Sequence, residues 1–307
     1  MLFGALEAGG TKMVVAIGDG NGKILDRKSL PTTTPEETMP LIEEYFREWN
    51  QNKDHEIKDH EIKALGVACF GPIDLDRNSD TYGYITSTPK TAWKNYNIVG
   101  ELKDKLGIPV GFDTDVNGSL LGEATWGCAR GLTDAIYLTI GTGIGGGVMS
   151  NGKLLHGMLH PELGHIRIGK LSSDPGECVC PYHKDCFEGL AAGPSIEKRW
   201  GKKGVELKDE AKVWELEAEY IGIALTDFVM TLSPQKIILG GGVMHQEQLF
   251  PMIRQAFEKY NAGYINADRL KNLDEYIVPA SLNDDQGIMG AIKLAIDELD
   301  YQSHIGL

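Results

Sequence analysis

Long hydrophobic runs are missing from this sequence. No stretch reaches the roughly 18 apolar residues that a membrane-spanning helix needs. The start at Met1-Leu2-Phe3 has neither the basic residues nor the long apolar core of a secretory signal. Basic residues are also few: 30 lysines and arginines face 44 aspartates and glutamates, which gives a formal net charge of −14 at pH 7. Such an acidic protein repels phosphate-rich polymers and anionic lipids, so we expect neither nucleic acid nor a membrane as a partner.

Cysteine is scarce as well, with five residues in a chain of 307. The number is odd, and three of the five crowd between positions 178 and 186. This pattern does not suit a disulfide framework and is typical of metal-bound or free thiols in a reducing compartment. We therefore expect a cytoplasmic protein.

The chain does contain a repeated order of apolar strands and glycine turns. The first copy consists of residues 2–7, 8–12 and 13–17, and the second of residues 135–140, 141–147 and 148–150. Each copy reads strand, glycine turn, strand, and each is followed by another turn, which indicates an internal duplication. Further predicted strands cover residues 23–29, 64–70, 108–112, 236–239 and 276–279, and predicted helices cover 35–50, 97–106, 119–126, 209–232, 251–260 and 285–299. Alternating strands and helices predict an α/β fold with ligands at strand ends between the halves.

A second, local duplication occurs at residues 54–63, where Asp-His-Glu-Ile-Lys is written twice. Paired histidines invite a metal-site interpretation. A solvated surface segment lengthened by duplication is the simpler interpretation, and we assign the segment no function.

Glycine loops at strand ends can bind phosphate, because backbone N–H groups approach an anion closely only where no Cβ intervenes. Three loops of this kind follow predicted strands, two of them with a threonine that adds a hydroxyl donor. They are Gly9-Gly10-Thr11-Lys12, Gly141-Thr142-Gly143 and Gly240-Gly241-Gly242-Val243-Met244. One such loop is usually a structural turn, but three together favour a nucleotide site.

Two common nucleotide motifs are excluded. Residues 141–146 read G-x-G-x-x-G, but the dinucleotide fingerprint needs a following helix, whereas residues 148–152 predict a strand and a turn. The Gly9 loop lacks the Gly-Lys-Ser/Thr order of a P-loop. We therefore expect a nucleotide site that is neither an NAD site nor a P-loop.

Two carboxylates follow the strand 108–112, at the place where α/β proteins gather their functional residues. Asp113 and Asp115 would share one face if the strand continued through them, and Asn117 follows in the adjoining turn. A carboxylate within hydrogen-bond reach is the expected base for a hydroxyl that attacks a phosphoryl group. A helix N-cap role for either aspartate is the alternative.

A dense group of metal-binding side chains lies between residues 165 and 186. Thiolate and imidazole at such spacing suit tetrahedral zinc, and four protein ligands leave no open position for a catalytic water. The spacing around His183 favours His165, Cys180, His183 and Cys186 as ligands, with Cys178 as the alternative. We predict a structural zinc site.

These motifs together resemble the ROK family of sugar kinases and repressors. The resemblance rests on Glu7 to Lys12, the Asp115 turn, Gly141 to Gly147, Glu162-Leu163-Gly164-His165 and the Cys/His group, in order over nearly the whole chain. Pro161-Glu162, Cys180-Pro181-Tyr182-His183 and Ala192 to Glu197 are most similar to the fructokinase branch.

The resemblance implies a two-domain actin/hexokinase-like (ribonuclease H-like) fold with central mixed sheets and an interdomain cleft. The domains would be 1–117, with helix 285–300 packed back on it, and 118–284, which would include the zinc loop 165–188. The implied cofactors are ATP, Mg²⁺ and Zn²⁺, and a homodimer is usual among such kinases.

The resemblance also implies roles for individual residues. Asp115 would be the general base. The sugar would contact Gly71, Pro72, Asn117, Glu162, His165 and Glu188. Phosphates and nucleotide would contact Gly9, Gly10, Thr11, Lys12, Thr142, Pro194, Gly240, Gly241, Gly242, Val243 and Met244. The chain departs from the common family pattern at Glu7, which is usually Asp, and at Asp113-Thr114, usually Glu-Asn. The metal group also contains histidine in place of the usual C-x-C-G.

We therefore predict an ATP-dependent fructokinase that phosphorylates the 6-hydroxyl of D-fructose. Glucose, mannose or an N-acylated aminosugar are the alternative substrates. A non-catalytic, sugar-responsive regulator is disfavoured, because family repressors carry a helix-turn-helix before the first glycine hairpin and this sequence begins at that hairpin.

Overall fold

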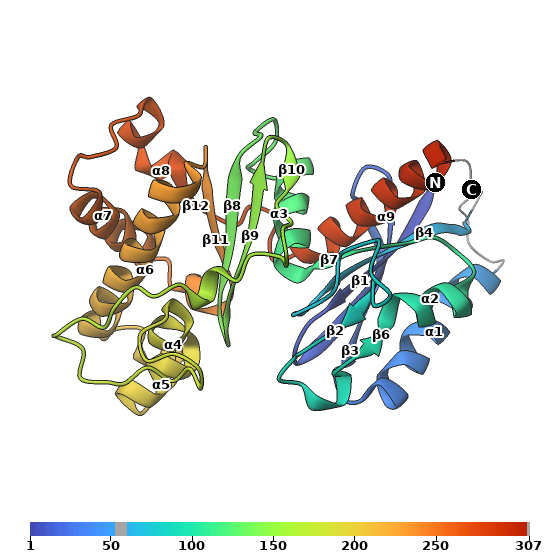
Figure 1. Cartoon of the computed structure of the whole chain (residues 1–307), viewed down its shortest axis with the longest axis horizontal. Coiled ribbons are helices and arrows are strands. Elements are labelled where there is room, and N and C mark those ends of the chain that lie inside the picture. Colours follow the sequence, from blue (N-terminus) through green and yellow to red (C-terminus); the bar gives the residue numbers. More distant parts are fainter. Residues whose placement is uncertain (53–59, 306–307) are drawn as a thin grey trace. The chain divides into compact units, whose positions relative to one another are not determined.

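The computed structural model describes residues 1–52 and 60–305 and divides the chain into two compact units. Unit 1 consists of Met1–Gly131, His156–His160 and the C-terminal segment from Ser281 (Figure 1). Unit 2 consists of Leu132–Leu155 and Pro161–Ala280. Most of the duplicated segment 54–63 lies outside the described residues.

Unit 1 is built on a five-stranded mixed sheet with the strand order β3-β2-β1-β4-β7. Its strands are β1 (Leu2–Ala8), β2 (Lys12–Asp19), β3 (Ile24–Pro31), β4 (Ile62–Cys69) and β7 (Val110–Thr114). β1, β2 and β3 form an antiparallel meander, while β4 and β7 run parallel to β1. Strands β1, β4 and β7 are almost wholly buried, as expected where helices cover both faces of a sheet.

The two faces of this sheet carry side chains of different size. Leu6 lies in the core shared with α1 (Pro35–Gln51) and α2 (Ile98–Leu106), whereas its neighbour Ala5 lies in the core shared with α9 (Gln286–Ile305). Alternate residues of a strand point to opposite faces, so one sequence can supply both surfaces. The small side chains let α9 lie close to the strands, and Figure 1 shows it along the face opposite α1 and α2.

The helix α3 (Asp115–Thr125) packs tightly against α9. A Cβ added to Gly290 would lie only 1.7 Å from the carbonyl oxygen of Gly118, so the two backbones meet without a side chain between them. The predicted boundary after residue 117 therefore falls inside α3. The first unit keeps the whole helix and continues to Gly131.

Unit 2 repeats the same strand pattern, with a sheet of order β10-β9-β8-β11-β12. Its strands are β8 (Ala135–Ile140), β9 (Ile144–Ser150), β10 (Lys153–Leu154), β11 (Ile237–Gly240) and β12 (Ile277–Pro279). The first three are antiparallel, and β11 and β12 run parallel to β8. The matching order in both sheets confirms the predicted duplication. A strand, β9, does follow the glycine turn 141–143, as predicted.

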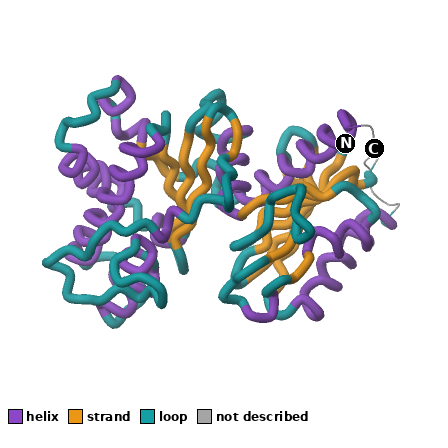
Figure 2. Tube along the Cα trace, in the orientation of Figure 1, coloured by secondary structure: helices purple, strands orange, loops and turns teal. Residues whose placement is uncertain are grey.

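The helices of unit 2 lie on one side of its sheet (Figure 2), and their buried side chains share one core with the strands. They are α4 (Phe187–Ala191), α5 (Gly193–Trp200), α6 (Ala211–Leu232), α7 (Leu249–Asn261) and α8 (Leu273–Tyr276). In unit 1, a small two-stranded sheet joins β5 (Tyr84–Ile85) to β6 (Tyr96–Asn97). Throughout the described part of the chain, no helix combines the length and the apolar character needed to cross a membrane.

Candidate active site and metal site

Asp115 is the first residue of α3, at the end of β7. The side chain of Thr114 accepts a hydrogen bond from the Asn117 N–H (3.1 Å) and so acts as the N-cap of the helix. The Asp115 side chain is partly exposed, and its Oδ1 accepts from the N–H of Val116 (2.9 Å). The expectation that Asp113 and Asp115 share a strand face is wrong, because the chain turns into helix at residue 115. Neither aspartate is the N-cap.

Asp113 is buried in β7, with 3% of its surface exposed, and accepts several hydrogen bonds. Its donors are the Thr114 N–H (2.7 Å), the Asn117 amide (2.7 Å) and Nε2 of His156 (2.8 Å). The hydrogen bond to Asp113 raises the pKa of His156. Asn117, predicted to support Asp115, thus uses its amide group to hold Asp113, while its Oδ1 has no hydrogen-bond partner among the described residues.

The segment His156–His160, for which no role was predicted, belongs to unit 1 although the chain on either side of it belongs to unit 2. Nε2 of His160 accepts from the N–H of Ile73 (3.3 Å), close to the predicted sugar contacts Gly71 and Pro72. With Thr86, His156 and His160 help to line a pocket of about 580 Å³. In the sequence, the only feature that could have pointed to this segment is the presence of two histidines just before Pro161-Glu162.

Glu7 lies near the end of β1, where its carboxylate meets the N-terminal turn of α9. A Cβ at residue 287 would be 2.5 Å from Glu7 Oε1, so the carboxylate lies directly against the backbone of this glycine. Burial and the nearby charge of Asp115 raise the pKa of Glu7 to about 7, and Asp284 and Asp285 add to the effect. This concentration of negative charge fits a divalent cation such as Mg²⁺.

The predicted nucleotide residues of unit 2 come together. Gly193, which precedes Pro194 at the start of α5, donates its N–H to the Gly141 carbonyl (2.7 Å). A Cβ on Gly141 would lie 3.6 Å from the backbone nitrogen of Gly242, at the beginning of the turn Gly242–His245. Three segments that are distant in sequence therefore meet at the ends of β8 and β11.

Glu188 and His165 connect this region to the Cys/His group. Glu188 Oε2 accepts from the N–H of Ile144 (2.9 Å), at the end of the glycine turn, and Oε1 lies 3.9 Å from Nε2 of His165. The exposed Glu162 immediately precedes the 3₁₀ turn Leu163–His165. Three predicted sugar-binding side chains of unit 2 thus lie on neighbouring segments.

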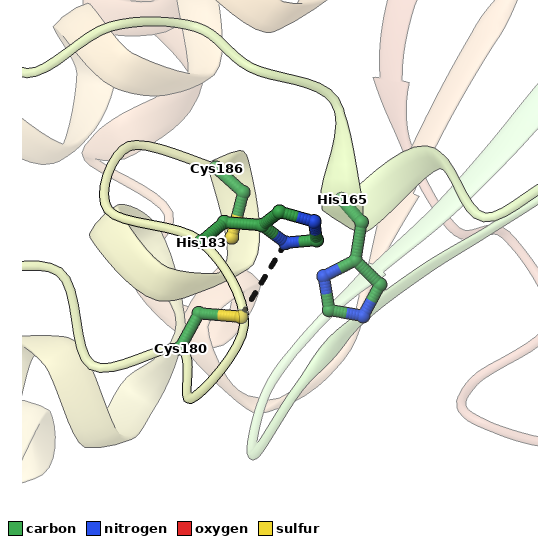
Figure 3. Close-up of side chains that lie close together, drawn as sticks. All are labelled: His165, Cys180, His183 and Cys186. Carbon is green, nitrogen blue, oxygen red and sulfur yellow. Dashed lines mark hydrogen bonds between the residues drawn. The ribbon is translucent and has the colours of Figure 1, made fainter.

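The predicted zinc ligands His165, Cys180, His183 and Cys186 form one group, with all ligand atoms within 4.8 Å of one another (Figure 3). Cys180 Sγ is 3.6 Å from Nδ1 of His183, and the buried Nδ1 of His165 has no hydrogen-bond partner among the described residues. Two thiols and two imidazoles within tetrahedral reach fit zinc. Cys178 lies outside the group, and its Sγ donates to the carbonyl of His183 (3.1 Å).

Comparison with known proteins identifies the family. The sequence model of the ROK family matches residues 3–298. This chain belongs to the ROK family. A Bacillus subtilis (strain 168) relative is 46% identical over 306 residues, 99% of each chain, and a fructokinase of Pediococcus pentosaceus is 45% identical over 295 residues, 96% of this chain and 98% of its own. A ROK hexokinase from Thermus thermophilus has a similar structure, with a TM-score of 0.76, 26% identity, and coverage of 98% of this chain and 100% of the other.

The predicted fold class is confirmed. Both sheets are mixed and repeat one strand order, as an actin/hexokinase-like fold requires, and the Thermus thermophilus hexokinase has a similar structure. The individual roles of the site residues stay predictions. In this ROK chain, unit 1 contains Asp115 and the hairpin Gly9 to Lys12, and unit 2 contains the other two glycine loops and the metal group.

Proposed function

We propose that this chain is an ATP-dependent fructokinase that transfers the γ-phosphoryl group of ATP to the 6-hydroxyl of D-fructose. The single observation that carries the proposal is sequence similarity to fructokinases over almost the whole chain. The fructokinases of Zymomonas mobilis and Lactococcus lactis, for example, are each 42% identical to it, and the matches cover 96% and 95% of this chain and 96% of each relative. The presence of Asp115, partly exposed at the start of α3, supports the same conclusion.

In the proposed reaction Asp115 is the general base. Its carboxylate accepts the proton of the 6-hydroxyl as that oxygen forms a bond to the γ-phosphorus and the bond from phosphorus to the ADP oxygen breaks. Phosphoryl transfer depends mainly on positioning and on charge neutralisation, so the reaction needs only one carboxylate beside the hydroxyl to act as its base. Mg²⁺, when bound, would neutralise phosphate charge, and Glu7 is the carboxylate that would hold it.

The phosphates are assigned to backbone N–H groups. Gly9, Gly10, Thr11 and Lys12 supply one loop and Thr142 another, while Pro194 and Gly240 to Met244 would hold the rest of the nucleotide. The convergence of Gly141, Gly193 and Gly242 within unit 2 supports this assignment.

The sugar hydroxyls are assigned to Glu162, His165 and Glu188 in unit 2 and to Gly71, Pro72 and Asn117 in unit 1. Carboxylate and imidazole groups accept and donate to hydroxyls with strict geometry, so they can select one hexose. The glucokinase of Halalkalibacterium halodurans is 25% identical to this chain, whereas the fructokinases of Pediococcus pentosaceus and Zymomonas mobilis are 45% and 42% identical to it. This difference favours fructose over glucose as the substrate.

Zinc would have a structural role in this proposal. Cys186 directly precedes α4, and its Sγ accepts from the N–H of Gly189 (3.4 Å). Glu188 lies in the first turn of the same helix, so a metal held by Cys186 would fix the position of Glu188. The homodimer remains a prediction drawn from the family.

Release of ADP, measured with MgATP and a panel of hexoses, tests the proposal. Fructose should give the highest kcat/KM, and mannose, glucose or N-acetylated aminosugars should be weaker. If another hexose gives the highest kcat/KM, the substrate assignment fails but the kinase assignment stands.

A further inference from the structure

Lys90 lies over the glycine hairpin of unit 1, although the sequence offered no reason to connect the two. A Cβ added to Gly10 would lie 2.9 Å from Cε of Lys90 and 3.5 Å from its Nζ. The ammonium group is therefore beside the backbone of the loop to which phosphate binding is assigned.

The position of Lys90 is fixed by a short, well-packed frame. The 3₁₀ turn Thr91–Trp93 follows it, and Trp93 is buried with 1% of its surface exposed. Nε1 of Trp93 donates to the carbonyl of Thr33 (2.8 Å), and the ring packs edge-on against Phe70. A buried indole with its N–H satisfied holds the adjacent chain in one place.

The same frame also holds the hairpin. Thr32, next to the residue that accepts from Trp93, donates its hydroxyl to the Gly9 carbonyl (2.8 Å) and its N–H to the Thr11 carbonyl (3.2 Å). Residues 32 and 33 thus connect the glycine loop on one side with the turn after Lys90 on the other. These bonds hold the backbone of both segments, and the Lys90 side chain extends from the one to Gly10 of the other.

The charge of Lys90 is available to an anion. Its Nζ lies 5.9 Å from the Phe70 ring centroid, and within residues 1–52 and 60–305 no carboxylate forms an ion pair with it. Lys12 is differently placed, because it is near enough to the Glu7 carboxylate to lower the pKa of that group. Of these two lysines at the hairpin, Lys12 already has a nearby negative charge.

We propose that Lys90 is a catalytic residue whose ammonium contacts the transferred phosphoryl group at the hairpin. This inference rests on the proposed kinase function. Negative charge spreads over the three outer oxygens of the phosphoryl group as it moves, and a fixed cation beside them stabilises that arrangement more than the bound ground state. Lys90 takes no part in the proton transfer, because the proton of the sugar hydroxyl passes to Asp115.

The test compares Lys90→Met, which keeps the length of the side chain and removes its charge, with Lys90→Arg, which restores a cation. Lys94→Met is the matched control, because Lys94 is an exposed lysine that follows the same turn. The measurements are kcat, KM for ATP and fructose, thermal unfolding, and the binding of MgADP with fructose, with and without aluminium fluoride as a mimic of the transferred group.

We expect Lys90→Met to lower kcat by about 10²- to 10³-fold, with KM for fructose within about threefold of wild type and an unchanged unfolding temperature. Binding of MgADP with aluminium fluoride should weaken by a similar factor, while MgADP alone binds as before. Lys90→Arg should recover part of kcat, and Lys94→Met should match wild type within about twofold.

Three results would overturn the proposal: a kcat for Lys90→Met within about threefold of wild type, a loss confined to KM for fructose, or equal losses for Lys90→Met and Lys94→Met. If Lys90→Met does not fold, an unchanged kcat and unchanged aluminium fluoride binding in Lys90→Gln decide against it in the same way. A wild-type protein that phosphorylates no hexose refutes the kinase function itself, which separates that failure from failure of the Lys90 assignment.

Discussion

Nε2 of His156 lies 2.8 Å from Oδ2 of Asp113, and this hydrogen bond connects residues 43 positions apart in the sequence. Asp113 is buried and also receives the amide of Asn117, two residues beyond the proposed base. The segment His156–His160 is therefore attached to the end of β7, where α3 begins. The bond gives this part of the proposed site a dependence on pH.

The first prediction concerns His156→Gln. Because the hydrogen bond to Asp113 raises the pKa of His156 in the folded protein, protonation of His156 stabilises the fold. That contribution is complete below the unfolded pKa of about 6.5 and is lost as pH rises through the higher folded pKa. Wild type should exceed His156→Gln in free energy of unfolding by about 1 kcal/mol near pH 6, and by less at pH 8.5.

Urea denaturation at a series of pH values measures this difference. His304→Gln, at the exposed end of α9, serves as the control. A constant difference between pH 6 and pH 8.5 would mean that the charge of His156 adds nothing to its bond with Asp113.

The second prediction concerns Glu7, whose pKa is raised to about 7 by burial and by Asp115. A carboxyl group with a raised folded pKa binds more protons in the folded state, so stability falls as pH rises from about 4.5 to 7. Glu7→Gln removes this loss and should therefore gain stability relative to wild type over that range, by at most about 3 kcal/mol.

Thermal unfolding of ligand-free protein at pH 5 and pH 8 provides the measurement, with the exposed Glu37→Gln as control. If Glu7→Gln is no more stable relative to wild type at pH 8 than at pH 5, the carboxyl group of Glu7 titrates normally. Turnover of Glu7→Gln should nevertheless fall, because the variant loses charge that would hold Mg²⁺.

The third prediction concerns the metal. Protein purified without chelator should contain about one zinc per chain, because two thiols and two imidazoles make a complete tetrahedral set. His183→Ala should lower zinc retention far more than Cys178→Ala, since Cys178 lies outside the group. Removal of zinc should expose residues 178–186 to protease and lower affinity for the sugar through Glu188.

Metal analysis and limited proteolysis check these expectations. Equal zinc loss from both variants would bring Cys178 back as a ligand, and zinc-free protein with an intact loop would exclude a structural metal.

The long elements and the duplication could be predicted from the sequence because each is marked by an apolar run or a glycine turn. The helices α4 and α5 are too short to show a helical period, and neither was predicted. The end of the first unit depends on the contact between Gly118 and Gly290, which no local pattern reveals. Only the structure shows that α3 and α9 form one packed pair.

The same distinction holds for the proposed site: side chains with distinctive chemistry could be predicted from the sequence, and contacts between distant segments could not. The four proposed metal ligands have distinctive chemistry, and three of them lie within seven positions, so the sequence could indicate them. The assumed common face of Asp113 and Asp115 failed because Thr114 caps the helix between them. His156 and Lys90 could not be found from spacing, because each acts on a segment far away in the chain.

The kinetics of Asp115→Asn test the central claim most directly. Asparagine keeps the size of the side chain but accepts the hydroxyl proton poorly, so kcat for fructose phosphorylation should fall by about 10²- to 10⁴-fold. Fructose binding, measured by calorimetry, should stay within a few-fold of wild type. Turnover near the wild-type value would contradict the account, because Asp115 would then not be the base.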